Sequence, residues 1–296
     1  MYKNIVTQTL RNPLHKLKRI EADVLRLDML HPVISGNKWF KLKYHIADAA
    51  AQHKKGLVSF GGAYSNHLVA MAWLCREHGL RSAGVIRGKE DDPANPSLQQ
   101  MKAAGMELVF VSREEYRDKS RLADDFLSEN PGYYYVPEGG RSAEGVKGAS
   151  EIISLSDNSY SHIICSVGTG TTLAGIIAAS QPSRQVTGVC ALKLPDAQHN
   201  DIVDFIDTHT SNKNYLIAFD YHFGGFAKFN GELIRYMNDF YRVENIPTDF
   251  VYTGKLFYAV EDMIRNDYFT SGSRLLLVHT GGLQGNRSLA PGTLVF

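Results

Sequence analysis

Short apolar runs that end in glycine-containing polar turns are the feature that most constrains the fold of this chain. Such runs are LVSFGG at 57–62, HIICSV at 162–167 and RLLLVH at 274–279. Stretches with apolar residues at helical spacing lie between runs of this kind, for example at 40–55 and 171–180. Alternating strands and helices favour right-handed crossovers and parallel sheets covered by helices on both faces. The sequence therefore predicts an α/β fold whose polar turns lie at the carboxyl ends of strands, where parallel sheets bind ligands.

Composition excludes several classes of protein. The 32 Lys and Arg residues nearly balance the 31 Asp and Glu residues, which argues against nucleic acid or an anionic membrane as the main partner. Cys75, Cys165 and Cys190 form no CxxC pair, which suits a reducing compartment better than a disulfide scaffold. No apolar run reaches the roughly 20 residues of a membrane span, and no motif has metal-ligand spacing. We therefore expect a cytoplasmic protein without a bound metal.

The turn SVGTGTT at 166–172 joins an apolar strand to a helix. The start of a helix offers N–H groups without intrahelical partners and a partial positive charge, and the glycines let a phosphate approach the backbone. The turn lacks the lysine of a Walker loop, which weighs against a nucleoside triphosphate. From these residues alone, a phosphate site and an ordinary tight turn remain equally good interpretations.

Two turns nearer the amino terminus carry reactive or polar side chains. Lys38, in SGNK at 35–38, lies at a predicted helix start, where a positive charge is unfavourable. It is either a solvated surface residue or an amine with a depressed pKa that can form a Schiff base. In GGAYSNH at 61–67, Ser65 is a good helix N-cap, whereas Asn66 is a poor helix former. This second turn has the hydroxyl, amide and backbone N–H groups that would bind a carboxylate.

Six segments of the chain, in order, resemble one family over nearly the whole length. The segments are SGNK at 35–38, GGAYSNH at 61–67, PEGG at 137–140, SVGTGTT at 166–172, VYTGK at 251–255 and HTGG at 279–282. They resemble the pyridoxal-phosphate-dependent enzymes of the 1-aminocyclopropane-1-carboxylate deaminase and D-cysteine desulfhydrase family. The resemblance implies the tryptophan-synthase-β-like fold, known as fold type II, with pyridoxal 5'-phosphate as cofactor and a homodimeric assembly.

The resemblance also implies a division into domains and a set of site residues. Residues 1–41 and 141–296 would form a large cofactor-binding domain, and residues 42–140 a small α/β domain. Lys38 would bind the cofactor through a Schiff base and then act as general base, with Ser65 and Tyr252 as the other catalytic residues. The implied substrate-binding residues are Ser65, Asn66 and His67. The implied cofactor-binding residues are Lys38, Asn66, Gly168, Thr169, Gly170, Thr171, Thr172, Thr253 and Thr280.

Thr253 and Thr280 distinguish two branches of the resembled family. Deaminases that open the cyclopropane ring carry glutamate and leucine at these positions, whereas the desulfhydrase branch carries threonine. A threonine hydroxyl leaves the pyridine nitrogen of the cofactor neutral, which weakens the cofactor as an electron sink. The two threonines therefore favour elimination of a good leaving group over opening of an unactivated ring.

The sequence thus predicts a pyridoxal-phosphate-dependent lyase or deaminase of amino-acid metabolism that acts on a small amino acid. The leading hypothesis is conversion of D-cysteine to pyruvate, ammonia and sulfide. The alternative is 1-aminocyclopropane-1-carboxylate deamination. A third hypothesis is a protein that binds the cofactor or another phosphate ligand without catalysis. Phe226 keeps this third hypothesis open, because the family has a second active-site tyrosine there, and Phe40 likewise replaces the family's usual arginine.

Overall fold

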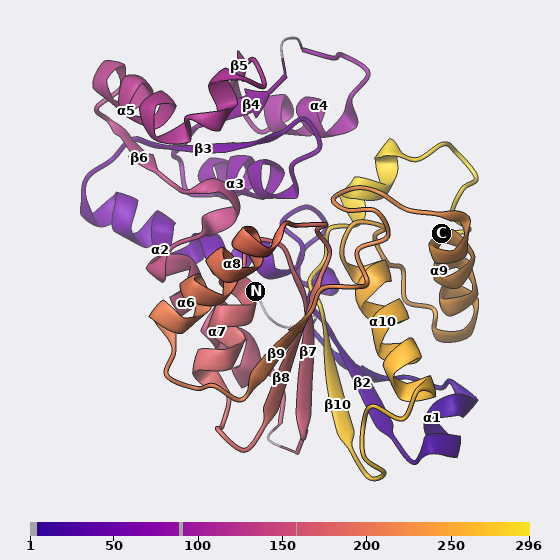
Figure 1. The fold of residues 1–296 in the computed structure, drawn as a ribbon. Helices are drawn as coiled ribbons and strands as arrows, with labels where there is room; N and C mark the ends of the chain where they lie inside the picture. The colour runs from indigo at the N-terminus through magenta and orange to yellow at the C-terminus, as the bar shows by residue number, and fades with distance from the viewer. Residues whose placement is uncertain (1–4, 89–90, 158) are drawn as a thin grey trace. The chain divides into compact units, whose positions relative to one another are not determined.

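The chain folds into two compact units. The computed structural model describes residues 5–88, 91–157 and 159–296. The larger unit comprises residues 1–37 and 149–296, and the smaller unit comprises residues 38–148. Each unit contains one sheet, and helices pack against it (Figure 1). No helix among the described residues is long and apolar enough to span a membrane.

The sheet of the larger unit has six strands in the order β1-β2-β10-β7-β8-β9. The strands are β1 (Thr7–Thr9), β2 (Glu21–Arg26), β7 (His162–Val167), β8 (Gln185–Cys190), β9 (Tyr215–Ala218) and β10 (Arg274–His279). All neighbouring strands pair in parallel except β1, which runs antiparallel to β2 at the edge. Leu277 at the centre of β10 pairs with Val24 on one side and Ile164 on the other, so the middle strands are apolar on both faces.

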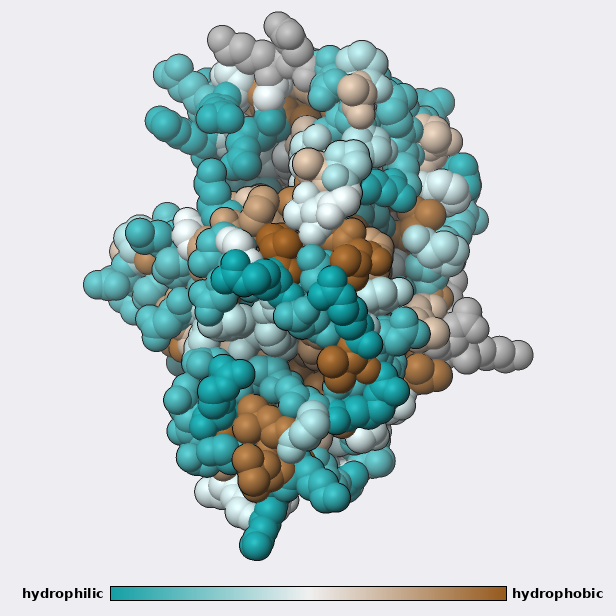
Figure 2. All heavy atoms as spheres, turned by 90° about the vertical axis from the view of Figure 1, so that its right-hand side faces the viewer, coloured by the Kyte–Doolittle hydropathy of each residue, from teal (hydrophilic) through white to brown (hydrophobic). Residues whose placement is uncertain are grey.

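Helices cover both faces of this sheet (Figure 1). The helices of the larger unit are α1 (Pro13–Lys18), α7 (Thr171–Ala179), α8 (Asp196–His209), α9 (Gly231–Glu244) and α10 (Thr253–Arg265). One core cluster joins Leu256 and Phe257 of α10 to Leu275 and Leu277 of β10. The surface seen in Figure 2 carries its hydrophobic residues in separate patches among hydrophilic ones. Cys75, Cys165 and Cys190 are all buried free thiols, and burial raises the pKa of each.

The smaller unit is a four-stranded parallel sheet in the order β5-β4-β3-β6. Its strands are β3 (Gly56–Gly62), β4 (Arg81–Arg87), β5 (Met106–Val111) and β6 (Tyr133–Tyr135). The helices around it are α2 (Asn37–Ala51), α3 (Asn66–Glu77), α4 (Pro96–Ala103), α5 (Lys119–Glu129) and α6 (Ala143–Ser150). The predicted α/β class, with parallel strands and crossover helices, is what the structure shows.

The unit boundaries lie at 37/38 and 148/149, whereas the sequence placed them at 41/42 and 140/141. Helices α2 and α6 of the smaller unit approach each other closely near these boundaries. A Cβ on Gly148 would lie 1.8 Å from the carbonyl oxygen of Phe40, so the two backbones touch at this point. Phe40 is itself fully buried, which explains an apolar residue at this position of α2.

The segment 113–129 does not form one continuous helix. It forms a 3₁₀ turn at Glu115–Arg117 and then α5 from Lys119. The Asp118 carboxylate accepts a hydrogen bond from the Arg121 backbone N–H and so starts α5 with a new cap. Asp118 is a good N-cap residue, and this preference explains where the longer helical pattern is interrupted.

Candidate active site

The predicted phosphate loop joins β7 to α7 in the larger unit. Gly170 has φ +83° and precedes the first helical residue, a conformation that favours glycine. The first N–H groups of α7 have no intrahelical acceptor, since the hydrogen bond from Ala174 to Gly170 starts the helix ladder. The hydroxyls of Thr169 and Thr171 lie 3.0 Å apart beside these N–H groups. The loop therefore offers backbone and hydroxyl donors of the kind that bind a phosphate.

The SGNK turn packs directly on this loop and on the HTGG turn after β10. Gly36 has φ +74°, and a Cβ on it would lie 1.9 Å from the Thr280 carbonyl oxygen. The Asn37 backbone N–H donates to that carbonyl oxygen at 3.2 Å, and its side-chain amide donates to the Thr172 hydroxyl at 2.7 Å. Since Lys38 follows Asn37 in the chain, these contacts fix the start of the segment that carries the predicted Schiff-base lysine.

Two buried hydroxyls meet at the carboxyl ends of neighbouring strands in the larger unit. The Ser166 Oγ of β7 lies 3.0 Å from the Thr280 Oγ1 after β10, and both residues are less than a tenth exposed. Thr280 was predicted from the sequence, whereas Ser166 was only part of a motif. Because both partners are neutral hydroxyls, this position offers hydrogen bonds without a negative charge.

Asp249 organises the turn that carries Tyr252. The fully buried Asp249 carboxylate accepts hydrogen bonds from the backbone N–H groups of Val251, Tyr252 and Thr253, at 2.8 to 2.9 Å. The Thr253 hydroxyl also donates to it at 2.7 Å and accepts from the Asp249 N–H at 2.8 Å. Thr253 is thus engaged inside the turn, and its predicted contact with the cofactor stays a prediction.

Tyr252 extends from this turn to the phosphate loop. A Cβ on Gly168 would lie 3.2 Å from the Tyr252 ring and 3.3 Å from its hydroxyl, so only glycine allows this approach without displacement. The phenol therefore lies beside the loop that is predicted to bind the phosphate. Sequence reasoning missed Asp249, because it lies three residues before the N-cap residue Tyr252 and so matches no usual cap signal.

In the smaller unit the predicted substrate-binding turn lies at the start of α3. The Ser65 hydroxyl accepts from the Leu68 N–H at 3.2 Å, as an N-cap does, and Asn66 begins the helix. A Cβ on Gly61 would lie 2.5 Å from the Ser65 Oγ, which explains glycine at the end of β3. The turn thus presents a hydroxyl and helix N–H groups at a site favourable to a carboxylate.

A cluster of basic side chains surrounds this turn. His67 is buried, with its Nε2 2.9 Å from the Ser59 hydroxyl, whereas its buried Nδ1 has no hydrogen-bond partner among the residues that the structure describes. Burial, then the charges of Lys41 and Lys38, hold the pKa of His67 well below its usual value. Burial and the charge of Lys38 likewise hold the pKa of Lys41 well below its usual value. Lys41, which sequence reasoning passed over, is therefore a buried amine whose neutral form is favoured.

These residues fit pyridoxal phosphate. The larger unit supplies a glycine loop at a helix start, which any side chain at Gly168 or Gly170 would crowd. The smaller unit supplies Lys41, a buried amine whose pKa is lowered, and His67, whose buried Nδ1 has no hydrogen-bond partner among the described residues. The groups of the larger unit suit a phosphate, and those of the smaller unit suit an aldehyde or a carboxylate.

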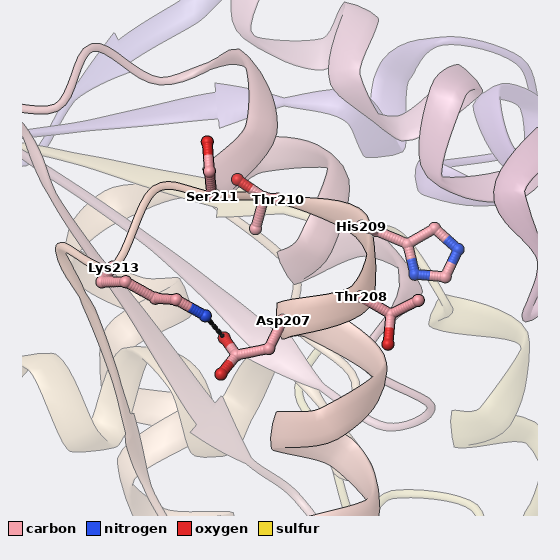
Figure 3. A pocket seen from close by; sticks show the side chains of 6 residues that line it. All are labelled: Asp207, Thr208, His209, Thr210, Ser211 and Lys213. Carbon is pink, nitrogen blue, oxygen red and sulfur yellow. Dashed lines mark ion pairs between the residues drawn. The ribbon is translucent and has the colours of Figure 1, made fainter.

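A surface hollow of the larger unit does not belong to this set (Figure 3). It is lined by Asp207, Thr208, His209, Thr210, Ser211 and Lys213. Asp207 and Lys213 form an ion pair at 2.7 Å within it. The hollow lies where α8 ends and before β9 begins, at the amino end of that strand. Ligands of parallel sheets bind at the opposite, carboxyl ends, so we assign this hollow no part in the active site.

Comparison with known proteins decides the family. The model of the family described as "Pyridoxal-phosphate dependent enzyme" matches residues 5–281. The chain belongs to this family. The chain is also 25% identical over 299 residues to a D-cysteine desulfhydrase of Yersinia enterocolitica, and the match covers 91% of each chain. It is 25% identical over 281 residues to a 1-aminocyclopropane-1-carboxylate deaminase of Rhizobium radiobacter, covering 84% of this chain and 82% of that one.

A solved structure of a 1-aminocyclopropane-1-carboxylate deaminase homologue superposes on this pyridoxal-phosphate-dependent enzyme with a TM-score of 0.81. The match has 25% sequence identity and covers 96% of this chain and 90% of that one. The predicted fold type II, the pyridoxal 5'-phosphate cofactor and the enzymatic nature of the chain are therefore confirmed. Relatives named for both reactions match the chain, so the comparisons place it in the deaminase and desulfhydrase family without separating the two.

Proposed function

We propose that this enzyme catalyses β-elimination from D-cysteine, giving pyruvate, ammonia and sulfide. The observation that carries the proposal is the buried hydroxyl pair of Ser166 and Thr280. A hydroxyl partner leaves the ring nitrogen of the cofactor neutral, whereas a carboxylate would hold it protonated. A neutral ring stabilises a carbanion less, which suits departure of a good leaving group such as a thiolate.

A buried carboxylate of the same unit is already fully engaged elsewhere. The Asp249 carboxylate accepts hydrogen bonds from three backbone N–H groups and the Thr253 hydroxyl, so its negative charge is compensated within the turn. The Thr253 hydroxyl, being engaged in that turn, leaves Thr280 as the better candidate for the ring nitrogen. The desulfhydrase assignment therefore rests more on Thr280 than on Thr253.

When bound, the cofactor withdraws electrons from the substrate Cα, and the remaining tasks fall to the chain. Lys38 would hold the cofactor, then accept the Cα proton at Nζ as general base. The N–H groups and hydroxyl at the start of α3 would orient the substrate carboxylate. The α7 loop would hold the phosphate, and Tyr252 would place a phenol beside the reacting atoms. Elimination releases sulfide, and water converts the remaining enamine to pyruvate and ammonia.

The test is a spectral titration of the cofactor-loaded enzyme with D-cysteine, L-cysteine and 1-aminocyclopropane-1-carboxylate, with assays for sulfide, 2-oxo acid and ammonia. We expect equal amounts of pyruvate, ammonia and sulfide from D-cysteine, and none from the variant Lys38→Ala. Product from the cyclopropane substrate alone would establish the deaminase alternative instead. A spectral change without any product would favour a binding protein.

A further inference from the structure

The segment between β9 and α9 contains an unusual concentration of left-handed backbone. Phe223, Gly224, Gly225 and Ala227 have φ values of 51°, 95°, 119° and 53°. Phe223 and Ala227 carry a Cβ that makes this conformation unfavourable, so surrounding contacts must impose it. We name residues 222–229 the Phe226 loop.

Lys255 holds the backbone of the Phe226 loop by hydrogen bonds. This residue of α10 is fully buried, and its Nζ donates to the carbonyl oxygens of His222 at 2.8 Å, Gly225 at 2.8 Å and Ala191 at 3.1 Å. An ammonium has three N–H donors, and all three are satisfied here by backbone carbonyls. The side chain therefore ties two points of the loop to the residue that follows β8.

The anchored backbone carries Phe226 to the predicted active site. Gly225 packs against Lys193, since a Cβ on it would lie 3.3 Å from the Lys193 Cβ. The next residue, Phe226, has its ring centroid 6.2 Å from that of Tyr252 in an edge-to-face arrangement, and it is 53% exposed. Tyr252 in turn lies against Gly168 of the phosphate loop. Lys255 lies in the first turn of α10, three residues after Tyr252, which is the N-cap of that helix.

We propose that Lys255 is a positioning residue of the active site: its ammonium fixes the Phe226 loop, so that the Phe226 ring forms a wall beside Tyr252 for the β-substituent of the substrate. The part of this inference that concerns substrate rests on the proposed function. The part that concerns the loop does not, because it depends only on the three hydrogen bonds. Lys255 makes no contact with the reacting atoms and acts through the loop it holds.

The first experiment measures hydrogen exchange of residues 219–230 in the full-length enzyme near neutral pH, without substrate. In Lys255→Ala we expect exchange of this segment to accelerate about tenfold or more, because its anchor is removed. Lys255→Met fills the space without donors and should show the same change. Lys228→Met, which alters an exposed lysine of the same loop, is the matched control and should leave exchange unchanged.

Chemical rescue distinguishes the hydrogen bonds of the ammonium from the packing of the side chain. Methylammonium added to Lys255→Ala should restore slow exchange, because it offers N–H donors to the same carbonyls. Tetramethylammonium has the charge but no N–H group, so it should not restore it. Unchanged exchange in both Lys255 variants, or equal rescue by the two cations, would overturn the proposed anchor.

Kinetics with D-cysteine test the link to the substrate. We expect Lys255→Ala to load the cofactor as the wild type does, while KM rises about tenfold and methylammonium lowers it again. Faster exchange of the loop with an unchanged KM would show that Lys255 fixes the loop but that the Phe226 ring does not contribute to substrate binding. If the wild type does not turn over D-cysteine, the exchange and rescue measurements still decide whether the anchor exists.

Discussion

Asp249 shows how one buried carboxylate can shape an active site without touching a ligand. Its two oxygens collect three backbone N–H groups and one hydroxyl, and thereby fix the residue that carries the phenol. Buried charges are costly unless they are hydrogen-bonded in this way. The position of Tyr252 is therefore set by the four donors on Asp249.

Replacing Asp249 by Asn should weaken this turn. The amide keeps one acceptor oxygen but replaces the other by an NH₂ group, which leaves backbone N–H groups without a partner. We expect the free energy of unfolding to fall by about 1–3 kcal/mol, and kcat to fall more than KM rises. Urea denaturation and steady-state kinetics measure both effects. Asp239→Asn, at an exposed i,i+3 ion pair of α9, is the control, and an equal effect there would contradict the prediction.

Lys255 gives the stability of the enzyme a recognisable pH dependence. Burial lowers the pKa of this residue to about 8 from its usual 10.5, although Asp249 and Cys190 oppose the shift. Between these two pH values the folded chain has lost the proton and the unfolded chain still holds it. The cost of burying the ammonium is therefore fully present below pH 8 and is relieved as pH rises through this window. The free energy of unfolding rises with pH there, with a slope of at most about 1.4 kcal/mol per pH unit.

The comparison of wild type with Lys255→Met isolates this contribution. Buried tyrosines and cysteines with raised pKa values titrate in the same range with the opposite effect, but both proteins share them. We expect the difference in unfolding free energy between wild type and variant to grow from about pH 7.5 to about pH 9.5. A constant difference across that range would show that Lys255 keeps an ordinary pKa.

At the scale of elements, turns hold the site together. The SGNK turn before α2 and the HTGG turn after β10 meet at Gly36, where a Cβ would lie 1.9 Å from a backbone oxygen. Asn37 then bonds to the start of α7. The start of α2, the turn after β10 and the start of α7 thus contact one another, and the contact at Gly36 requires a glycine.

Gly36→Ala tests this packing, and Gly79→Ala is a close control. Both glycines have a positive φ, +74° and +67°, so both substitutions carry similar backbone strain. Only Gly36 faces a backbone oxygen, whereas nothing lies within 4 Å of a Cβ on Gly79. We expect Gly36→Ala to be the more destabilising by about 1–3 kcal/mol in thermal or urea unfolding, and to weaken cofactor binding. Equal destabilisation would argue against close packing of the two turns.

The central strands and most helices could be predicted from sequence because their patterns are local. β3, β4, β7 and β10 are apolar runs with turn residues at their ends, and the bounds of β7 and β10 match those expected. β2 and α8 were not anticipated: EADVLR contains two acidic residues, and α8 lies in a polar stretch whose buried residues are few. Asp23 of β2 is buried and accepts a hydrogen bond from the Tyr160 hydroxyl. This partner lies 137 residues away in the sequence, so no local pattern indicates it.

The candidate site shows the same limit. The motif turns predicted which loops would carry chemistry, and the structure places the phosphate loop, Tyr252 and Thr280 in the larger unit and Lys38 with Ser65 and Asn66 in the smaller one. The roles of Asp249, Lys41 and Lys255 depend on burial and on distant backbone oxygens. Such roles follow from the fold and cannot be recognised from residue type alone.

At the scale of the whole molecule, the chain passes between its two units at residues 37/38 and 148/149. The predicted Schiff-base lysine is the first residue of the smaller unit, directly after a residue fixed to the phosphate loop. The residue that would carry the cofactor covalently is thereby joined, by one peptide bond, to a residue that hydrogen-bonds to the loop that would hold the phosphate. The homodimer implied by the family resemblance stays a prediction.

The burial of all three cysteines has a consequence for an enzyme that would consume a thiol and release sulfide. Cystine, persulfides and other oxidised sulfur species form readily in such a mixture and exchange with accessible thiolates. Burial raises the pKa of Cys75 and Cys165 to about 12, so neither offers a thiolate at neutral pH. We expect a disulfide reagent to modify the unfolded chain at all three cysteines and the native enzyme at none. The fold would thus protect the catalyst from the sulfur chemistry of its own reaction.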